Sequence, residues 1–426
     1  MKIIIVSDTP WQDNNSFGSS FSNIFGGDFG YEIANVYCQT GGPNTKVCHR
    51  FFQITEKGII QSILKKGITG REIFNSNSVQ NLEKNEELLL KKIKIARWQL
   101  FFWARDLVWA TGQWRSKNLY DFINNFRPDL IVLPIYYSTY LNNIGLYIKR
   151  LTGKPLVGYI SDDCYSLKQF SISPLYWVDR LVKRIYVKKA IESCDVLFTI
   201  TETQKNEYNT IFGNKCKVLF KGGDFSNFDH RKTELNNPLK FVYTGNIGSG
   251  RWKTLALIGD ALAKTNNKAE LIIYSQTLLS KKNSKRLLQS GIVKFMGAIH
   301  SSKVKDVQRD ADILVHVESF ELKERYSARL SFSTKIVDYL EAGRCILAVG
   351  WEQTGAIDYL KKYDGAVVIT NRELLENEII YLTNNYSKIV LYGDKSFNLG
   401  KQYHQIEKIR DELYNNLIQV VGNEIE

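Results

Sequence analysis

Two basic residues in the second half of the chain stand where an anion could be bound. Arg251 follows a glycine-rich turn that begins at Gly245, directly after an apolar run. Lys335 follows Ser333 and Thr334, two residue types that are common at helix N-caps. A guanidinium fork suits phosphate oxygens, and the open N–H groups of a helix start favour an anion. Arg251 and Lys335 are therefore interpreted as a clamp for a phosphate-bearing group. The alternatives are two solvated surface cations and, for Ser333 and Thr334, an ordinary N-cap without a ligand.

Two further candidates lie in the first half of the chain. Residues 16–20 (SFGSS) follow the first apolar run after a short polar loop, and such a loop could approach a phosphate group closely because Gly18 has no side chain. Asp162 and Asp163 end the run 156–162 (LVGYISD). Adjacent residues of a strand point to opposite faces, so at most one of these acids can serve a site, and we favour Asp162. The alternatives are a plain surface loop and two helix-capping acids.

Short apolar runs that alternate with helical patterns must position these residues. Such alternation is typical of βαβ units and of a parallel sheet covered by helices on both faces. The expected strands are 2–8, 31–37, 129–136, 156–162, 196–201 and 217–222, then 240–245, 270–275, 292–297, 312–317, 345–350 and 365–370.

The alternation is interrupted once, by the polar segment 229–238 (DHRKTELNNP), after which it restarts. A chain of 426 residues suits two domains of this kind. We expect an α/β fold with an N-terminal domain at 1–229, a linker at 230–238 and a C-terminal domain at 239–385. The helical segment 386–426 should pack back toward the N-terminal domain. Two facing Rossmann-like domains would hold a ligand in the cleft between them, at the carboxyl ends of the strands.

Composition narrows the class of protein. No apolar run approaches the length that spans a bilayer, and the start MKIIIVSD is too short in its apolar part for a secretory signal, so a cytoplasmic location is expected. The six cysteines show neither C-x-x-C pairs nor metal-like histidine spacing, which indicates buried thiols and no metal site. A net charge of +13 indicates an acidic partner, but no nucleic-acid motif is present.

The order of several motifs is more specific than any one of them. The stretch 193–228 runs as a strand, Thr199-Ile200-Thr201-Glu202, a helix, a strand, then Lys221-Gly222-Gly223-Asp224 and Phe228. It resembles the end of the N-terminal domain of GT-B glycosyltransferases, with Lys221 in place of their Asn. The stretches 241–252, 295–315 and 331–350 are similar, in order and spacing, to the donor domain of the family 4 type. The resemblance covers most of residues 190–350.

This resemblance implies roles for individual residues. Arg251 and Lys335 would hold the diphosphate of a UDP- or GDP-linked sugar, with no other cofactor and no metal. Asp338 matches the second acid of the family's Glu-x7-Glu motif, which accepts hydrogen bonds from ribose hydroxyls. The first acid is replaced by Leu330, and Glu318 or Glu321 could compensate. Asp162 stands where related enzymes often hold a His or Asp near the reacting sugar carbon.

Residues 89–118 carry seven Lys or Arg against one acid, together with four of the eight tryptophans. Basic and aromatic residues on a helix are typical of contact with an anionic membrane surface. The stretch 98–114 is also apolar nearly all round, which equally fits a helix buried in the N-terminal domain. Both interpretations stay open at this point.

The sequence therefore predicts a glycosyltransferase of the GT-B fold that moves a sugar from a nucleotide donor to an acceptor hydroxyl, with retention. The expected acceptor is a glycan or lipid-linked glycan of bacterial surface polysaccharide synthesis, at the inner face of the plasma membrane. One alternative keeps the fold but changes the reaction, a sugar-nucleotide epimerase. The other is from a different class, a non-catalytic sugar-nucleotide-binding partner protein.

Overall fold

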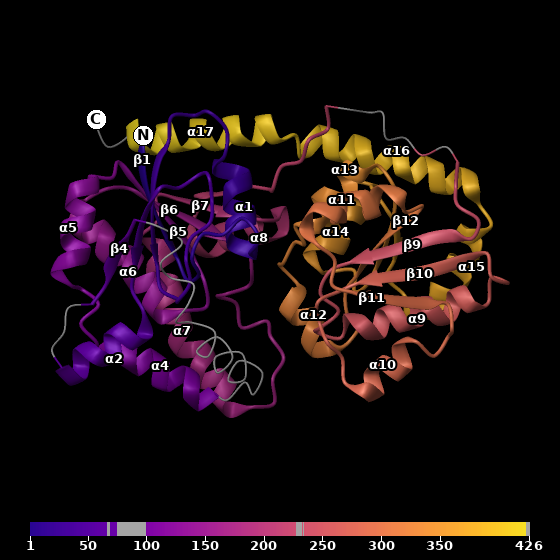
Figure 1. The fold of residues 1–426 in the computed structure, drawn as a ribbon, viewed down its shortest axis with the longest axis horizontal. Helices are drawn as coiled ribbons and strands as arrows, with labels where there is room; N and C mark the ends of the chain where they lie inside the picture. Colours follow the sequence, from indigo (N-terminus) through magenta and orange to yellow (C-terminus); the bar gives the residue numbers. More distant parts are fainter. Residues whose placement is uncertain (66–68, 75–98, 227–231, 233, 423–426) are drawn as a thin grey trace. The chain divides into compact units, whose positions relative to one another are not determined.

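The computed structural model describes residues 1–65, 69–74, 99–226, 232 and 234–422, and its chain divides into two compact units (Figure 1). Unit 1 comprises Met1–Leu167, Ser171–Leu219 and Arg410–Glu426, and unit 2 comprises Lys168–Phe170 and Phe220–Ile409. The division after Leu219 comes earlier than the linker expected at 230–238. The reason is aromatic packing: the ring of Phe220 lies 5.6 Å from that of Phe332 and 4.8 Å from that of His404, both in unit 2.

Unit 1 is built on a sheet with strand order β4-β3-β2-β1-β5-β6-β7-β8 in the described residues. All neighbouring strands are parallel except β3 and β4, which pair antiparallel at one edge. Its elements are β1 (Lys2–Ser7), α1 (Ser16–Phe25), β2 (Glu32–Tyr37), β3 (Arg50–Gln53), α2 (Glu56–Lys65), β4 (Arg71–Ile73), α4 (Gln99–Thr111), α5 (Lys117–Phe126), β5 (Leu130–Pro134), α6 (Thr139–Thr152), β6 (Leu156–Ile160), α7 (Pro174–Glu192), β7 (Val196–Thr199), α8 (Glu202–Phe212) and β8 (Cys216–Val218).

Unit 2 has a parallel sheet with strand order β11-β10-β9-β12-β13-β14. Counted within the unit this is the order 3-2-1-4-5-6 of a Rossmann-like domain. Its elements are β9 (Leu239–Thr244), α9 (Arg251–Ala263), β10 (Ala269–Tyr274), α10 (Lys281–Leu287), β11 (Val293–Gly297), α11 (Ser301–Asp310), β12 (Ile313–Val317), α12 (Leu322–Ala328), α13 (Lys335–Ala342), β13 (Cys345–Val349), α14 (Gly355–Lys362), β14 (Val367–Ile369), the 3₁₀ helix η2 (Arg372–Leu374), α15 (Leu375–Thr383), α16 (Tyr386–Tyr403) and α17 (Ile406–Gly422), whose last part belongs to unit 1.

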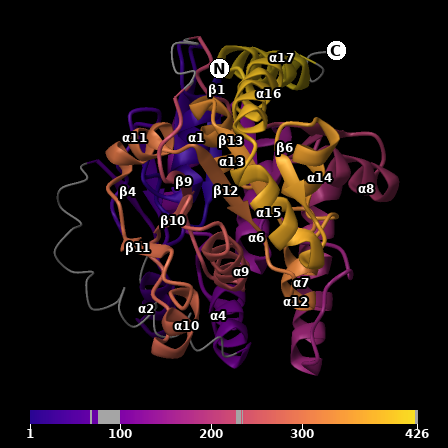
Figure 2. The same ribbon diagram turned by 90° about the vertical axis from the view of Figure 1, so that its right-hand side faces the viewer.

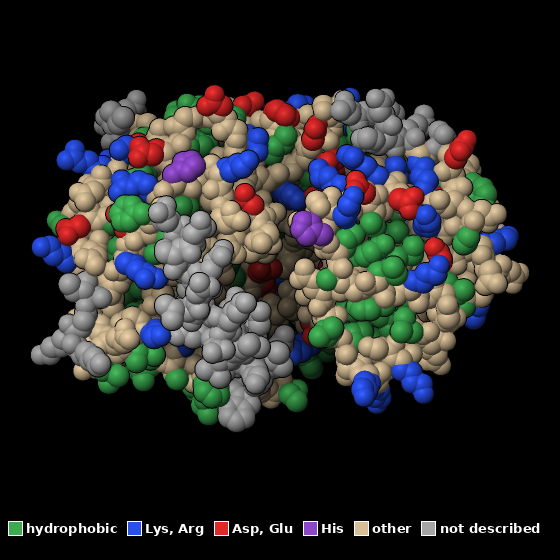
Figure 3. Space-filling view, viewed as in Figure 1, with side chains coloured by type: hydrophobic (Ala, Val, Ile, Leu, Met, Phe, Trp, Pro, Cys, Tyr) green, Lys and Arg blue, Asp and Glu red, His purple; other side chains and the backbone are tan. Residues whose placement is uncertain are grey.

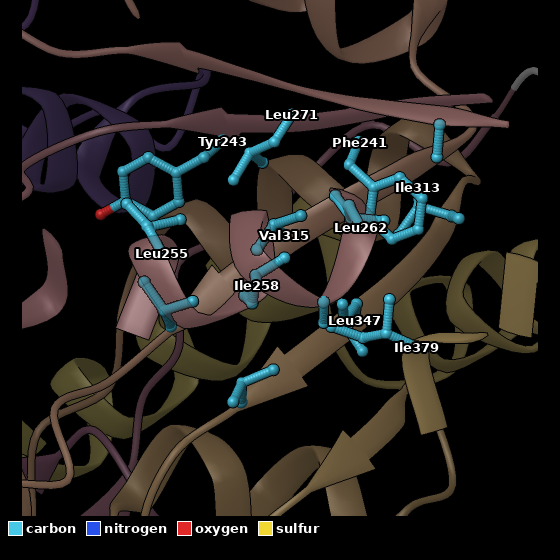
Figure 4. Packing of buried hydrophobic residues seen from close by; sticks show 14 of the residues in the cluster. Phe241, Tyr243, Leu255, Ile258, Leu262, Leu271, Ile313, Val315, Leu347 and Ile379 are labelled. Carbon is cyan, nitrogen blue, oxygen red and sulfur yellow. The ribbon is translucent and has the colours of Figure 1, made fainter. Parts of the chain in front are cut away.

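The core of unit 2 lies between the sheet and the helices α9 and α15. Leu255, Ile258 and Leu262 recur on α9 at helical spacing and are fully buried against strand residues such as Phe241 and Val315 (Figure 4). Strands β12 and β13 are buried along their whole length because helices cover each side of a parallel sheet. This packing fixes the carboxyl ends of β9 and β12, from which the candidate site is built.

The C-terminal segment divides between the units, whereas all of 386–426 was expected from the sequence to pack toward the N-terminal domain. Helix α16 packs on α13 and β13 of unit 2. Only residues from Arg410 onward belong to unit 1, where Arg410 Nε donates a 2.8 Å hydrogen bond to the carbonyl of Asn23. The rings of Tyr414 and Phe29 lie 5.5 Å apart. The final helix therefore ties the end of the chain to the first domain.

Every strand expected from the sequence is present, within about two residues at the ends for most of them. The short strands β3 and β4 were not expected. The six cysteines are buried thiols, as predicted. In the part of the chain that the structure describes, no helix combines the length and the apolar character that crossing a bilayer requires.

Candidate functional site

Arg251 is the first residue of α9, directly after the turn that follows β9. Its side chain forms a bidentate ion pair with Glu318, which follows β12: Nε lies 3.0 Å from Oε2 and Nη2 lies 3.1 Å from Oε1. Burial raises the pKa of Glu318 even though the guanidinium of Arg251 lowers it. Burial opposes the charge of Arg251 too, but the carboxylate of Glu318 outweighs it, so the pKa of Arg251 is raised. The pair fixes the guanidinium and leaves Nη1 outside the fork.

Lys335 is the first residue of α13, and its ammonium reaches back to the end of β9. Nζ lies 5.0 Å from the ring centroid of Tyr243, a cation–π contact. A β-carbon at Gly245 would come within 1.8 Å of this Nζ, and Gly245 has a φ of +146°, so only glycine fits there. Burial and the nearby Arg251 lower the pKa of Lys335 to about 8.

These groups meet at one place in the unit 2 sheet. Strands β9 and β12 are neighbours, and the chain leaves β9 toward one side and β12 toward the other, so their carboxyl ends form the topological switch point. Ligands of doubly wound sheets bind at that point. Arg251 and Lys335 each carry a positive charge there and Glu318 a negative one, which leaves a net positive site. Such a site is suited to an anion.

Asp338 lies one helical turn beyond Lys335 on α13, as the spacing predicted. Its Oδ1 lies 2.6 Å from Nζ of Lys221, the residue that stands in the Asn position of the GT-B motif. Both side chains are partly exposed, at 27% and 17%. The carboxylate is therefore held in place by a cation and still reaches solvent.

Ser333 and Thr334 do not form the expected N-cap. Thr334 occupies the cap position of α13 in a helical conformation, and its side chain makes no capping hydrogen bond. The carbonyl of Ser333 accepts a 2.9 Å hydrogen bond from the N–H of Ile336. Because a capping side chain needs an extended backbone at this position, the helical φ and ψ of Thr334 explain the difference.

A buried histidine lies next to the ion pair, and no sequence motif had indicated it. Nε2 of His316, on β12, is 3.7 Å from Oε1 of Glu318 and has no hydrogen-bond partner among the described residues. Burial, together with the charges of Lys335 and Arg251, lowers the pKa of His316 to about 3. The imidazole is therefore neutral at physiological pH and adds no charge to the site.

Gly18 lies in unit 1 and is placed differently from the expectation of a loop. It belongs to the first turn of α1, where its N–H donates a 2.7 Å hydrogen bond to the side chain of Asn15. A β-carbon at Gly18 would lie 2.0 Å from the backbone oxygen of Gln12. Packing of the helix start against the preceding turn thus requires glycine here, whether or not a ligand is present.

The two acids after β6 in unit 1 have different surroundings. Asp163 is buried, accepts a 2.8 Å hydrogen bond from the N–H of Ser166 and pairs with Arg180 at 3.2 Å. Asp162 is exposed, and its carbonyl accepts hydrogen bonds from Cys164 and Gln204. Asp163 is therefore a structural acid, and neither residue caps α7, which begins at Pro174. The preference for Asp162 stays a prediction.

Neither of the two acids that could compensate for Leu330 has an unpaired carboxylate. Glu318 is bound by Arg251, and Glu321 pairs with Lys253 at the surface. Leu330 itself is fully buried. Phe228 and the basic residues 89–98 lie outside the described residues. Among the described residues, no group of three His, Cys, Asp or Glu side chains is arranged to hold a metal ion.

Comparison with known proteins supports the architecture. No family model matches the sequence, and no curated protein matches it. Solved structures do match in three dimensions. Anabaena HepE, solved with UDP-glucose, covers 98% of this chain and 100% of its own at 13% identity, with a TM-score of 0.62. Sucrose-phosphate synthase from Thermosynechococcus elongatus covers 99% of both chains at 12% identity, with a TM-score of 0.65.

A third structure is WaaG, a glycosyltransferase involved in lipopolysaccharide biosynthesis, which covers 97% of this chain and 99% of its own at 12% identity, with a TM-score of 0.59. Identities this low show the fold alone. The chain has the GT-B fold with two Rossmann-like domains, which confirms the fold predicted from the sequence.

Proposed function

We propose that the protein is a metal-independent glycosyltransferase that moves a hexosyl group from a nucleotide sugar to an acceptor hydroxyl, with retention at the anomeric carbon. One observation carries the proposal: Arg251 and Lys335 converge on the carboxyl ends of β9 and β12 in a domain of the GT-B fold. HepE, which shares this fold, was solved with UDP and with UDP-glucose, and this favours a UDP-linked donor over a GDP-linked one.

The two cations have a direct catalytic use in such a reaction. As the glycosidic bond breaks, negative charge grows on the diphosphate leaving group, and fixed positive groups stabilise that charge. The ammonium of Lys335 and the Nη1 side of Arg251 would supply this stabilisation. Glu318 contributes by holding the guanidinium in one orientation. Asp338, held by Lys221, would accept hydrogen bonds from the hydroxyl groups of the ribose, and Asp162 is the carboxylate that we propose to act near the reacting carbon.

We place the acceptor among glycans or lipid-linked glycans of bacterial surface polysaccharide synthesis, and the protein in the cytoplasm, peripheral to the plasma membrane. The positive charge of +13 and the role of WaaG in lipopolysaccharide biosynthesis support this placement.

The test is a donor panel with two readouts. Purified protein is incubated with UDP-, GDP- and ADP-linked sugars, and both the nucleoside diphosphate and the sugar are analysed. We expect slow release of nucleoside diphosphate from one donor class, and a decrease of about tenfold to a thousandfold in Lys335→Met. Conversion of the sugar to an epimer would identify an epimerase. Donor binding by calorimetry without turnover, even with lipid-linked acceptors, would identify a binding partner.

A further inference from the structure

Unit 1 contains a pocket of 380 Å³ between α4, α6 and α7, apart from the residues assigned to the transfer reaction. Its wall is largely aromatic and aliphatic, and includes Trp103, Trp109, Trp114, Tyr140, Val182 and Tyr186. The rings of Trp109 and Tyr140 stack 4.3 Å apart and both residues are buried. Binding sites for small molecules have volumes in this range and similar apolar walls.

The charged groups of the pocket are already paired with one another. Asp179 accepts hydrogen bonds of 2.9 Å from Nε1 of Trp103 and from the hydroxyl of Tyr137. Nζ of Lys183 lies 2.9 Å from Asp179 and 3.6 Å from Asp106. In a buried ion pair of this kind, the charged atoms of each side chain are already satisfied by those of the other. What the pocket offers a ligand is therefore mainly its apolar surface, beside the polar side chain of Asn143.

The mouth of the pocket is apolar as well. Leu107, Val178 and Val182 line the pocket and are nevertheless 63%, 50% and 47% exposed. Further exposed apolar side chains continue along α7, at Leu175, Leu181 and Ile185. Figures 1 and 2 show α4 and α7 projecting from the same end of unit 1, and Figure 3 shows hydrophobic side chains along the margin where these helices end. Exposed apolar side chains gathered at the mouth of an apolar pocket favour contact with an apolar partner or phase.

Positive charge flanks this apolar mouth. The guanidinium of Arg115 lies 4.8 Å from the ring centroid of Trp114, and Nζ of Lys189 lies 5.9 Å from that of Tyr186. Both rings line the pocket, and both cations are exposed. Aromatic rings, an apolar face and cations at its edge are what a protein needs to sit on an anionic lipid surface.

We propose that the pocket between α4, α6 and α7 binds one acyl chain of an anionic phospholipid at a bilayer surface, with Arg115 and Lys189 facing the headgroup phosphates. The site deepens the membrane attachment stated under the proposed function, and it makes no use of the sugar donor. It also reconciles the two interpretations of the tryptophan-rich stretch, because Trp109 and Trp114 are buried in unit 1 and at the same time line a pocket that opens outward.

The test measures quenching of tryptophan fluorescence by phosphatidylglycerol vesicles whose acyl chains carry bromine, with unbrominated vesicles as reference. Quenching requires close contact between bromine and an indole ring. We expect the wild-type protein to be quenched. Val178→Asp combined with Val182→Asp, which places charge at the mouth, should abolish quenching. The matched control is Ile211→Asp on α8, which is 46% exposed and lies outside the pocket, and it should be quenched like the wild type.

Two further variants separate the pocket from general surface attachment. Ala110→Phe fills the pocket from an exposed lining position without adding charge, and should remove quenching while sedimentation with vesicles persists. Arg115→Gln with Lys189→Gln should lower the affinity for phosphatidylglycerol roughly thirtyfold and leave phosphatidylcholine binding unchanged.

Absence of quenching in the wild type, or equal quenching in the Val178/Val182 variant, would overturn the proposal. Thermal unfolding verifies that each variant is folded. If Val178→Asp and Val182→Asp destabilise unit 1, the quenching of Ala110→Phe tests the proposal in their place. No donor is present in these measurements, so they succeed or fail independently of the transferase activity.

Discussion

The ion pair between Arg251 and Glu318 changes what the loss of Arg251 means. Glu318 is 8% exposed in its side chain, so removing its partner leaves a buried, uncompensated charge. A turnover defect in a single Arg251 variant would therefore mix lost catalysis with lost stability. Separating the two effects requires a second substitution at Glu318.

Arg251→Met should lower the free energy of unfolding by about 3–5 kcal/mol, because the carboxylate of Glu318 is left buried without its partner. Adding Glu318→Gln should restore most of that loss, while donor turnover stays about tenfold to a thousandfold below wild type. Urea unfolding and nucleoside diphosphate release measure the two quantities. Recovery of turnover in the double variant would remove Arg251 from the mechanism, and Glu318→Gln alone is the control.

The lowered pKa of Lys335 predicts that donor binding depends on pH. Its pKa is lowered to about 8 in the free protein, and a bound diphosphate would raise it again. Binding therefore takes up a proton wherever Lys335 is neutral beforehand, that is, above about pH 8. The dissociation constant for UDP should be flat below this pH and rise above it by at most about tenfold per pH unit.

Calorimetric titrations between about pH 7 and about pH 9 measure this dependence. Comparing the heats in buffers of different ionisation enthalpy gives the number of protons taken up on binding. Lys335→Met should bind more weakly and lose the dependence in this range. An unchanged slope in the methionine variant would assign the titration to another group.

The sequence singled out these residues as candidates but did not indicate which side chains they contact. Arg251 follows a turn and Lys335 begins a helix, and both features can be recognised from the local sequence pattern. Glu318 is 67 residues from Arg251 and Lys221 is 117 residues from Asp338, so both pairs depend on strand order rather than on spacing. Lys221 itself stood out only as a departure from the GT-B motif.

At the scale of elements, most strands were predictable, including the short β7, β8 and β14, whereas β3 and β4 were not. Strand β5 (Leu130–Pro134) is buried throughout and continuous in apolar residues. Strand β3 (RFFQ) has only two apolar residues and β4 (REI) only one, so neither forms an apolar run that stands out from its flanks. For α1, the glycine and serines of residues 16–20 favoured a loop, but burial of Phe17, Phe21 and Phe25 on one face stabilises the helix.

Helix α1 provides a test of whether Gly18 serves packing or donor binding. Gly18→Ala should lower the free energy of unfolding by about 1–3 kcal/mol, because its β-carbon would collide with the backbone of Gln12. Ser19→Ala, at an exposed position of the same helix, should stay within about 0.5 kcal/mol of wild type. A Gly18→Ala variant of normal stability with weakened UDP binding would instead support the ligand role.

At the scale of the whole molecule, the division into units is not sequential. Residues 410–426 return to unit 1 after the whole of unit 2, and the segment 168–170 belongs to unit 2. The restart of the strand pattern after 238 indicated two domains correctly. It could not show where each domain ends, because the contacts of Phe220 and Arg410 that set the boundaries join residues that are far apart in sequence.

This arrangement predicts that the last helix stabilises the first domain. Leu417, on the part of α17 assigned to unit 1, is fully buried, while Ile418 beside it is 45% exposed. Leu417→Ala should cost about 2–5 kcal/mol through lost burial and a residual cavity. Ile418→Ala should change stability by less than about 0.5 kcal/mol, because it removes little buried surface.

Native-state hydrogen exchange measures the protection of backbone amides in each of the two units separately. In Leu417→Ala we expect the amides of β1 and β5 to exchange faster, since their protection depends on the global stability of unit 1, while those of β9 and β12 keep wild-type rates. Loss of protection in β9 with β1 unchanged would contradict the assignment of α17 to unit 1. Equal loss in both would show that the units unfold as one cooperative body, and the C-terminal helix would then stabilise the site residues of unit 2 as well.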